Sequence, residues 1–487
     1  MTNLFNKRGS LLIMTYYVIS SLVVIGAAFV VLTVNDQRTS NRHQINIQAV
    51  NLAESGLEQA LYQLKLDYNN SHSFQDGDIN GISAGPDSNN YIELIPATNL
   101  GIGSYQVDIK NVGGSNREIW VKASGIVRDN TQSIEAYVKM VDGSVWSNAI
   151  FVGNGSGTKG INGNADIRGS VHILGTSLTA TDKAISLSGG GFIGNNYLGL
   201  TGTYLNKIAV LPTTTFNGES VASLFAQVRV KSGVIDLTSS ASLGLSDSAG
   251  NAYKETLDNV LINDGLTGTN ASDVFADNDT KPYDLSGVSF PSLTDSYPGY
   301  VSFQNYLYSN ALVISDSGEL ATLASLTDTT TFSKTSAKGS ITFDGAGNLS
   351  VSGIVYLDGG GLNLVSGTFN YTGSGVILVS GNITINANLL PATNASFPST
   401  NIITLMTPQQ IIFNQNGIEA VGLFYGENQI TFSQQASIAG SLVSNYIDMP
   451  SSNPTIIHVP AITSHLPSGT IASTQNWMPT IVSWKKL

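Results

Sequence analysis

The feature that most constrains this chain is an apolar run near its N-terminus. Between Arg8 and Asp36 there is no charged residue, and residues 10–34 are mostly Leu, Ile, Val, Ala, Tyr and Phe. A helix of this length, rising about 1.5 Å per residue, crosses a hydrocarbon core of about 30 Å. A secretory signal has a shorter apolar region and a small-x-small cleavage site, and neither is clear here. The sequence therefore predicts a single-pass transmembrane helix over residues 10–34.

The flanking charges predict how this helix is oriented. Lys7 and Arg8 end a basic leader, residues 1–9, and positive residues tend to stay on the cytoplasmic side. Arg38 and Arg42 lie beyond the other end of the apolar run and weaken this prediction slightly. We expect an inner (cytoplasmic) membrane anchor with the bulk of the chain extracytoplasmic.

The helix is expected to continue beyond the membrane as an amphipathic segment over residues 35–66. From Gln44 onward there is no proline until Pro86, and apolar or small residues recur every three or four positions. The small members of this stripe would allow another helix or a sheet to approach closely. The positions expected to serve helix packing and assembly are Ile45, Ala49, Leu52, Ala53, Gly56, Leu57, Ala60 and Leu64.

The segments "KRGSLLIMTYYVISSLVVIG" and "AVNLAESGLEQAL" resemble the N-terminal region of PilX-type minor pilins, within the type IV pilin and pseudopilin class. The resemblance implies that a prepilin peptidase cuts after Gly9, which would leave Ser10 as the new N-terminus. It also implies other pilin-like subunits and a pilus or secretion assembly machinery as partners, and a place in a cell-surface filament.

Two positions depart from the pattern of the major pilins, which begin with an aromatic residue and carry glutamate at the fifth mature position. Here these positions hold Ser10 and Met14. Some minor pilins and tip pseudopilins also lack the glutamate, so Met14 is compatible with a tip or initiating subunit. The alternative is an uncut anchor that holds an external domain.

Composition narrows the function classes. Charged residues are only 11% of the chain, the net charge is −12, and the 22 Lys and Arg residues are not clustered. Phosphate binding requires clustered cations, so we expect no nucleic-acid partner. The chain has no cysteine, which excludes disulfides and thiolate chemistry.

Two β regions are expected after the helix. Over residues 67–147 a polar connector precedes "SYQVDIKNV", "REIWVKASGIV" and "SIEAYVKMV", whose alternation predicts three strands of a pilin-like antiparallel sheet. Residues 148–487 consist of short aliphatic triplets punctuated by Gly and Asn, a texture that favours a parallel β-helix-like solenoid. A β-sandwich is the alternative. We expect an excursion at about 247–335, with a short helix near 251–261, and a C-terminal cap at about 455–487.

Several motifs suggest chemistry, but none has the context that the chemistry needs. "GISAG" around Ser83 lies in a polar loop, and "GSGTKG" at 155–160 continues as strand rather than helix. The acidic group of residues 273–279 offers oxygen ligands for calcium without EF-hand spacing. Asp344 and Asp358 are isolated candidates, and no two histidines have the i, i+4 spacing of a zinc helix. We therefore assign no catalytic, cofactor-binding or metal-binding residue and expect a protein that is not an enzyme.

Two functions remain open. The first is a membrane-inserted minor pilin or pseudopilin subunit that displays a β-rich head for an assembly, tip or adhesion role, with a surface or glycan ligand. The second is a membrane-tethered β-helix protein that binds or cleaves carbohydrate and is not part of a filament. An uncharged, Asn/Thr-rich wall favours the first, and a compact cleft of charged residues on adjacent coils favours the second.

Overall fold

The computed structural model describes residues 5–71, 73–74, 89–113, 115, 117–156, 159–285, 287–449, 453–472 and 477–487. These residues belong to two compact units. The first contains Met1–Val141 together with Trp477–Leu487, and the second contains Asp142–Asn476. The second unit is thus inserted into the chain of the first, immediately before its last strand.

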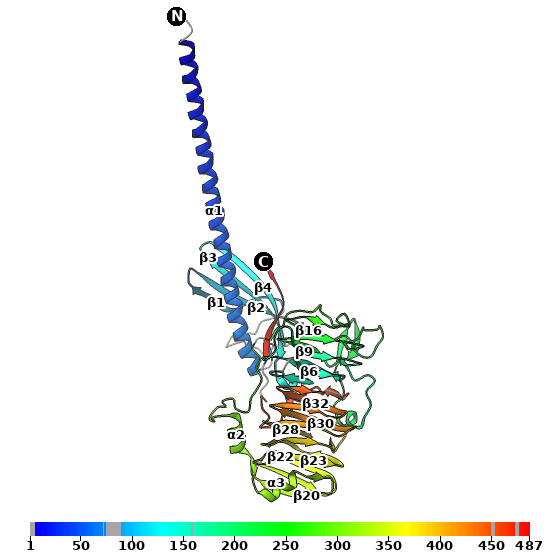
Figure 1. The fold of residues 1–487 in the computed structure, drawn as a ribbon. Coiled ribbons are helices and arrows are strands. Elements are labelled where there is room, and N and C mark those ends of the chain that lie inside the picture. Colours follow the sequence, from blue (N-terminus) through cyan, green and yellow to red (C-terminus); the bar gives the residue numbers. More distant parts are fainter. Residues whose placement is uncertain are drawn as a thin grey trace. The chain divides into compact units, whose positions relative to one another are not determined.

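The first unit is a long helix packed on a five-stranded sheet. Helix α1 runs over Phe5–Ser71 without interruption, and Figure 1 shows it in blue extending well past the strands on which it packs. The strands lie in the order β1 (Ile92–Leu100), β2 (Gly103–Asn111), β3 (Glu118–Val127), β4 (Asn130–Asp142) and β35 (Trp477–Lys486). The pairings β1–β2, β2–β3 and β3–β4 are antiparallel.

The helix and the sheet approach each other closely at a glycine. Every second residue of β3 is buried, because one face of the strand packs beneath α1. A Cβ atom at Gly125 would lie 1.9 Å from the Ala49 carbonyl oxygen of α1. Only glycine at this position allows the two backbones to come so close.

The sheet differs from the sequence-based expectation in two respects. It has five strands instead of three, because β1 and β35 join the predicted β2, β3 and β4. Residues 477–487 were expected to cap the solenoid, but they form β35 beside β4. The pairing of β4 with β35 joins strands that precede and follow the whole second unit in the chain, so no local pattern in the sequence predicts it.

The second unit is built from two long sheets. The larger sheet contains β5 (Ile150–Val152), β7 (Asp166–Arg168), β8 (Val171–Ile173), β10 (Phe192–Gly194), β13 (Gln227–Val230), β15 (Ser242–Leu243), β16 (Asn259–Ile262), β18 (Leu312–Ile314), β20 (Thr331–Ser336), β21 (Gly339–Asp344), β22 (Asn348–Leu357), β24 (Thr368–Thr372), β25 (Ser374–Val379), β27 (Asn388–Pro391), β28 (Ile402–Thr407), β30 (Ile418–Gly426), β32 (Ala436–Ser444) and β34 (Thr455–His458). The smaller sheet contains β6 (Lys159–Gly163), β9 (Lys183–Leu187), β14 (Val234–Leu237), β17 (Leu266–Thr267), β19 (Leu326–Thr327), β23 (Leu362–Ser366), β26 (Ile383–Ile385), β29 (Gln410–Phe413), β31 (Gln429–Phe432) and β33 (Ile447–Asp448).

The unit also contains a hairpin, β11 (Thr213–Phe216) and β12 (Glu219–Ala222), and the short helices α2 (Phe303–Asn310) and α3 (Ser317–Leu323). Its described residues also form the 3-10 helices η1 (Val145–Ser147), η2 (Thr203–Lys207) and η3 (Ile462–Ser464). The short helix expected near 251–261 does not form, because the segment ends in strand β16.

The larger sheet bends to form two walls of a solenoid. The first residues of β22 pair with β24 and its last residues pair with β25, both in parallel. Strand β32 is divided in the same way between β34 and β5. At this bend Gly440 has a φ of +142°, and a Cβ there would lie 1.8 Å from the Gly422 carbonyl oxygen. Glycine is therefore required where the coil turns its corner.

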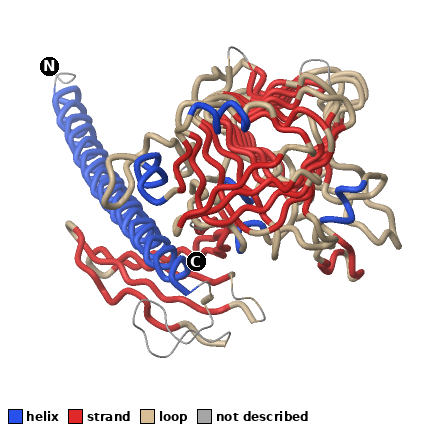
Figure 2. The backbone as a smooth tube through the Cα atoms, turned by 90° about the horizontal axis from the view of Figure 1, so that it is seen from below, coloured by secondary structure: helices blue, strands red, loops and turns tan. Residues whose placement is uncertain are grey.

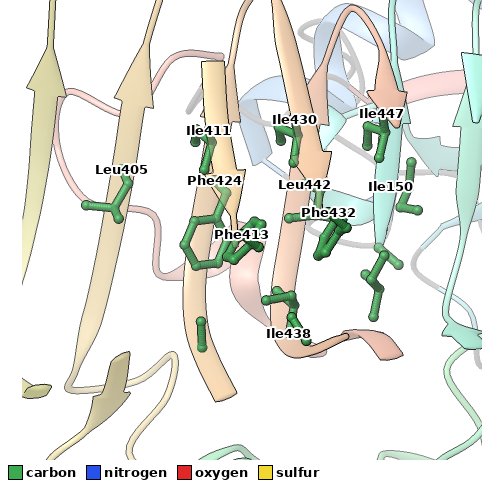
Figure 3. Close-up of a cluster of buried hydrophobic side chains, with 14 of the residues drawn as sticks. Ile150, Leu405, Ile411, Phe413, Phe424, Ile430, Phe432, Ile438, Leu442 and Ile447 are labelled. Atoms are coloured by element: carbon green, nitrogen blue, oxygen red, sulfur yellow. The ribbon is translucent and has the colours of Figure 1, made fainter. Parts of the chain in front are cut away.

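The interior of the solenoid is filled by ladders of aliphatic and aromatic side chains. One ladder takes one buried residue from each successive coil: Val355, Ile377, Leu405, Phe424, Leu442, Ile150, Val171, Val228 and Val260. The smaller sheet adds an isoleucine ladder that includes Ile383, Ile411, Ile430 and Ile447. Figure 2 looks along this stack at the walls of red strands, and Figure 3 shows the side chains between them.

The expected fold class is confirmed: the protein is mainly β, with one long N-terminal helix, a small antiparallel sheet and stacked parallel sheets. Parallel pairing throughout most of the second unit argues against the β-sandwich alternative, in which strands would pair antiparallel.

The coils do not stack in sequence order. Strand β5, the first of the second unit, pairs with β32, one of its last. From this seam β8, β13 and β16 continue in one direction, while β30, β28, β25, β22 and β18 lie in the other. Figure 1 shows the seam between the orange strand β32 and the teal strand β6. The chain must therefore travel from one end of the stack to the other between β16 and β18.

Candidate assembly helix and display surface

The N-terminal half of α1 exposes all of its apolar side chains from Leu12 to Val34. Among the described residues it is the one helix long and apolar enough to span a membrane. The hydroxyls of Ser20 and Thr33 donate hydrogen bonds to the carbonyls of Tyr16 and Phe29 at 2.6 and 2.8 Å, so these polar groups are satisfied within the helix. This segment is suited to an apolar surrounding.

The C-terminal half of α1 packs on the sheet of its own unit. Of the eight positions expected to serve packing, six are buried apolar residues, namely Ala49, Leu52, Ala53, Leu57, Ala60 and Leu64, and Ile45 is partly buried. The eighth is Gly56, where a Cβ atom would lie 2.9 Å from Cδ2 of Tyr105. The stripe thus meets a sheet, and the opposite face, with exposed Ile47, Tyr62 and Leu66, faces outward.

The end of α1 is held by the last strand. Trp477 is buried and packs edge-on against Tyr68, with ring centroids 5.2 Å apart. The Asn69 side chain accepts from the Trp477 amide at 2.9 Å and donates to its carbonyl at 3.2 Å. The Arg117 guanidinium lies 4.8 Å from the Trp477 ring centroid. These contacts tie the C-terminal strand to the helix.

A segment that we call the strap, residues 281–285 and 287–310, covers one outer face of the solenoid. Beneath it lies an outward ladder of one residue per coil: Tyr356, Leu378, Met406, Tyr425, Val443, Phe151, His172, Arg229 and Leu261. The strap bonds to this ladder on both sides of the seam, through Asp284 to Arg229 at 2.9 Å and through the Pro291 carbonyl to the Tyr425 hydroxyl at 2.7 Å. This segment lies within the excursion expected at about 247–335, whose outer parts instead supply strands β16 to β20 of the two sheets, and it spans the seam.

Two buried histidines belong to this framework. His172 shares a 2.7 Å hydrogen bond with the Tyr283 hydroxyl, and burial, with Arg229 and Lys231 nearby, holds its pKa well below the usual range. His458 donates to the Trp146 carbonyl at 3.2 Å, and burial lowers its pKa to about 4. Both imidazoles are therefore neutral near pH 7.

The outer face of the smaller sheet carries a second ladder that we call the polar wall. The ladder takes one residue from each successive coil, and its members are Asn363, Thr384, Ile412, Thr431, Asp448, Asn162, Ser186 and Asp236. All of them are partly exposed except Asp236, which is buried. Asp236 is paired with Lys183 at 2.8 Å. The wall is thus mainly hydroxyl and amide groups at one coil spacing, about 4.8 Å.

The acidic loop is organised by a lysine. Lys254, 4% exposed, forms ion pairs with Asp258 at 2.5 Å and Asp277 at 2.6 Å. Asp273 accepts a 2.7 Å hydrogen bond from Asn270. The ammonium group thus sits among these carboxylates, and no group of three or more His, Asp or Glu among the described residues is arranged to hold a metal.

A cavity of about 190 Å³ lies beside this loop, between the β11–β12 hairpin and residues 247–253. Its carboxylates are Glu219 and Asp247. Glu219 accepts from the Gly250 amide at 3.1 Å, and Asp247 accepts from the Glu255 amide at 2.6 Å and the Thr256 hydroxyl at 2.7 Å. Both carboxylates therefore hold the backbone of residues 247–256 in place.

The remaining sequence motifs are not brought together. Ser83 lies outside the described residues, and Gly160 lies in strand β6, not at the start of a helix. Asp344 ends β21 beside the start of β22, whereas Asp358 follows the other end of β22. Gly9 and Ser10 lie within α1. The strap aromatics were not singled out from the sequence, although Tyr and Phe are dense between 283 and 308.

Comparison with solved structures identifies a similar chain fold. The crystal structure of the competence-associated pilin ComZ from Thermus thermophilus matches at a TM-score of 0.57 and 18% identity, over 91% of this chain and 97% of that chain. No protein-family model matches the sequence, and no curated protein sequence matches it. The similarity shows the fold, which is pilin-like across most of the chain.

Proposed function

We propose that this protein is a minor pilin or pseudopilin-type subunit. It is inserted in the inner membrane through residues 10–34, cut by a prepilin peptidase between Gly9 and Ser10, and assembled through α1 into a type IV pilus-type filament. Its other partners are pilin-like subunits and the pilus or secretion assembly machinery. The chain has a structural role and is not an enzyme.

One observation carries this proposal. A single helix exposes its apolar side chains from Leu12 to Val34, and its C-terminal half is buried on an antiparallel sheet. Exposed apolar surface of this extent requires lipid or other apolar helices to cover it. A filament subunit has lipid around this surface before assembly and the apolar helices of its neighbours around it afterwards. The fold shared with a competence-associated pilin supports this conclusion.

The solenoid is then the displayed head, at the filament tip or surface. The polar wall supports a role in adhesion, because its hydroxyl and amide groups are suited to hydrogen bonds with an uncharged glycan. It lacks the clustered carboxylates that glycoside hydrolysis would use.

The test is the intact mass of the membrane-extracted protein, produced with and without a prepilin peptidase. The proposal predicts loss of residues 1–9 only when the peptidase is present. A Gly9→Leu variant is the matched control and should remain uncut. Full-length mass in every sample would contradict processing by this pathway.

A further inference from the structure

Two pairs of like charges on α1 are left without partners. Arg38 and Arg42 are exposed and lie four residues apart, as are Glu54 and Glu58. None of the four forms an ion pair within the part of the chain that the structure describes. Like charges at i, i+4 repel each other on a helix surface. Each pair would therefore be stabilised by an external pair of opposite charge with the same spacing.

The two pairs are matched in position as well as in charge. Each arginine precedes its glutamate by 16 residues, Arg38 to Glu54 and Arg42 to Glu58. This separation is about 24 Å along the axis and about 160° around it. When two parallel copies of a helix lie side by side, opposite faces meet. A copy displaced by about 24 Å would therefore place its arginines against the glutamates of its neighbour.

The same displacement aligns apolar residues. Val31 precedes Ile47 by 16 residues, and these side chains are 59% and 48% exposed. The register that pairs the charges thus also covers an exposed isoleucine with an exposed valine.

The glutamates border a groove that suits an arginine side chain. Glu54, Leu57 and Glu58 of α1 line a groove of about 600 Å³ together with Ile134 of β4 and Ile481 and Trp484 of β35. Trp484 is 63% exposed. A guanidinium group forms paired hydrogen bonds with carboxylates and stacks on aromatic rings, and its aliphatic stem suits apolar walls.

We propose that this groove binds Arg38 and Arg42 of a second copy of this chain, with the two α1 helices parallel and displaced by about 24 Å. The inference rests on the proposed filament role. Two copies anchored at one depth in a bilayer cannot adopt this displacement. The contact requires one copy to move along its axis relative to the other, which chains in detergent micelles are free to do and which would occur in cells on leaving the membrane for a filament.

The natural chain has no cysteine, so disulfide crosslinking can test this contact directly. Two differently tagged full-length chains, Arg42→Cys and Glu58→Cys, are mixed in detergent micelles and oxidised. We expect a crosslinked heterodimer. The matched control replaces Glu58→Cys with Gln59→Cys, which is also exposed but points about 100° away, and should remain at background. Equal crosslinking of both pairs, or of neither, would overturn the proposal.

Charge reversal provides a second readout. Arg38→Glu with Arg42→Glu in every copy should weaken self-association of the full chains in micelles by on the order of tenfold, and adding Glu54→Arg and Glu58→Arg to the same chain should restore it. Failure of the restored combination to associate would contradict the charge pairing. These micelle measurements need no peptidase or filament, so their failure is distinguishable from failure of the proposed function.

Discussion

The two units of the protein are each built from a repeated local pattern and completed by one long-range pairing. In the first unit the strands β1 to β4 follow each other along the chain, and β35 joins them only after the second unit has been traversed. In the second unit coil follows coil, except at the seam where β5 pairs with β32. The difference lies in how the closing element is held: Trp477 enters a small core in the first unit, whereas in the second a strap crosses many coils. We call these two arrangements closures. In the first unit the closure depends mainly on one side chain, that of Trp477, and in the second unit it is distributed over the contacts that the strap makes with several coils.

The largest effect is expected when the concentrated closure is removed. Trp477→Ala should destabilise the first unit by about 4 kcal/mol, because it deletes a buried indole beside Tyr68. Hydrogen exchange should increase in β2 to β4 and stay unchanged in β28 to β32. The control is Trp484→Ala on the same strand, where the side chain is exposed and exchange should change little. Loss of protection in both units would show that their stabilities are coupled, against this view.

Low pH should destabilise the second unit. The pKa of His458 is about 4 in the folded chain and near 6.5 when unfolded, so the unfolded state binds the proton first. Stability is then complete above about pH 6.5 and falls by about 3 kcal/mol as the pH decreases toward 4. Unfolding of the solenoid by denaturant, followed at several pH values, measures this slope. His458→Gln should make this slope shallower and leave the part due to His172, whose pKa is also lowered by burial. An unchanged slope would exclude His458 as a source.

The close approach of helix and sheet can be disturbed by one methyl group. Gly125→Ala would place a Cβ against the Ala49 carbonyl and should destabilise the first unit by about 2 kcal/mol. Gly26→Ala, where nothing lies within 4 Å, is the matched control and should cost nothing measurable. Thermal unfolding of the two variants, with hydrogen exchange to assign the unit, makes the comparison. Equal melting temperatures would mean that α1 is not held against β3 as described.

The smallest effect is expected at the distributed closure. Tyr425→Phe removes the hydrogen bond to the Pro291 carbonyl and should cost about 1 kcal/mol. Hydrogen exchange should rise in the strap near residue 291 while the interior ladder stays protected. Tyr308→Phe, at an exposed strap tyrosine, serves as the control. Global loss of protection would show that the strap, like Trp477, is a single point of closure.

The parts of the structure that were predictable are those with local periodicity. The three-to-four spacing from Ile45 to Leu64 predicted the face of α1 that is buried, and the alternation in "SYQVDIKNV" and its neighbours predicted β2, β3 and β4. Short aliphatic triplets between glycines favoured stacked coils, because each triplet contributes the inward residues of one wall, but they did not determine whether the strands are parallel or antiparallel.

The closures could not be predicted, because their partners are far apart in sequence. Leu442 pairs with Ile150, and the Trp477 amide bonds to Asn69, without any repeat that relates the two positions. The acidic loop was ambiguous for a different reason: Lys254, which pairs with Asp277, is 23 residues away in the chain. The unpaired charges of α1 were visible in the sequence, but their lack of partners became apparent only once the sheet was in place.

The central claim is that this chain is a filament subunit, and the most direct measurement is its location and mass in cells that carry the assembly machinery. Filaments sheared from the surface are probed with an antibody to the solenoid, and the recovered chain is weighed intact. We predict labelled filaments that contain a chain beginning at Ser10. A chain found only in the inner membrane, still carrying residues 1–9, would contradict the account.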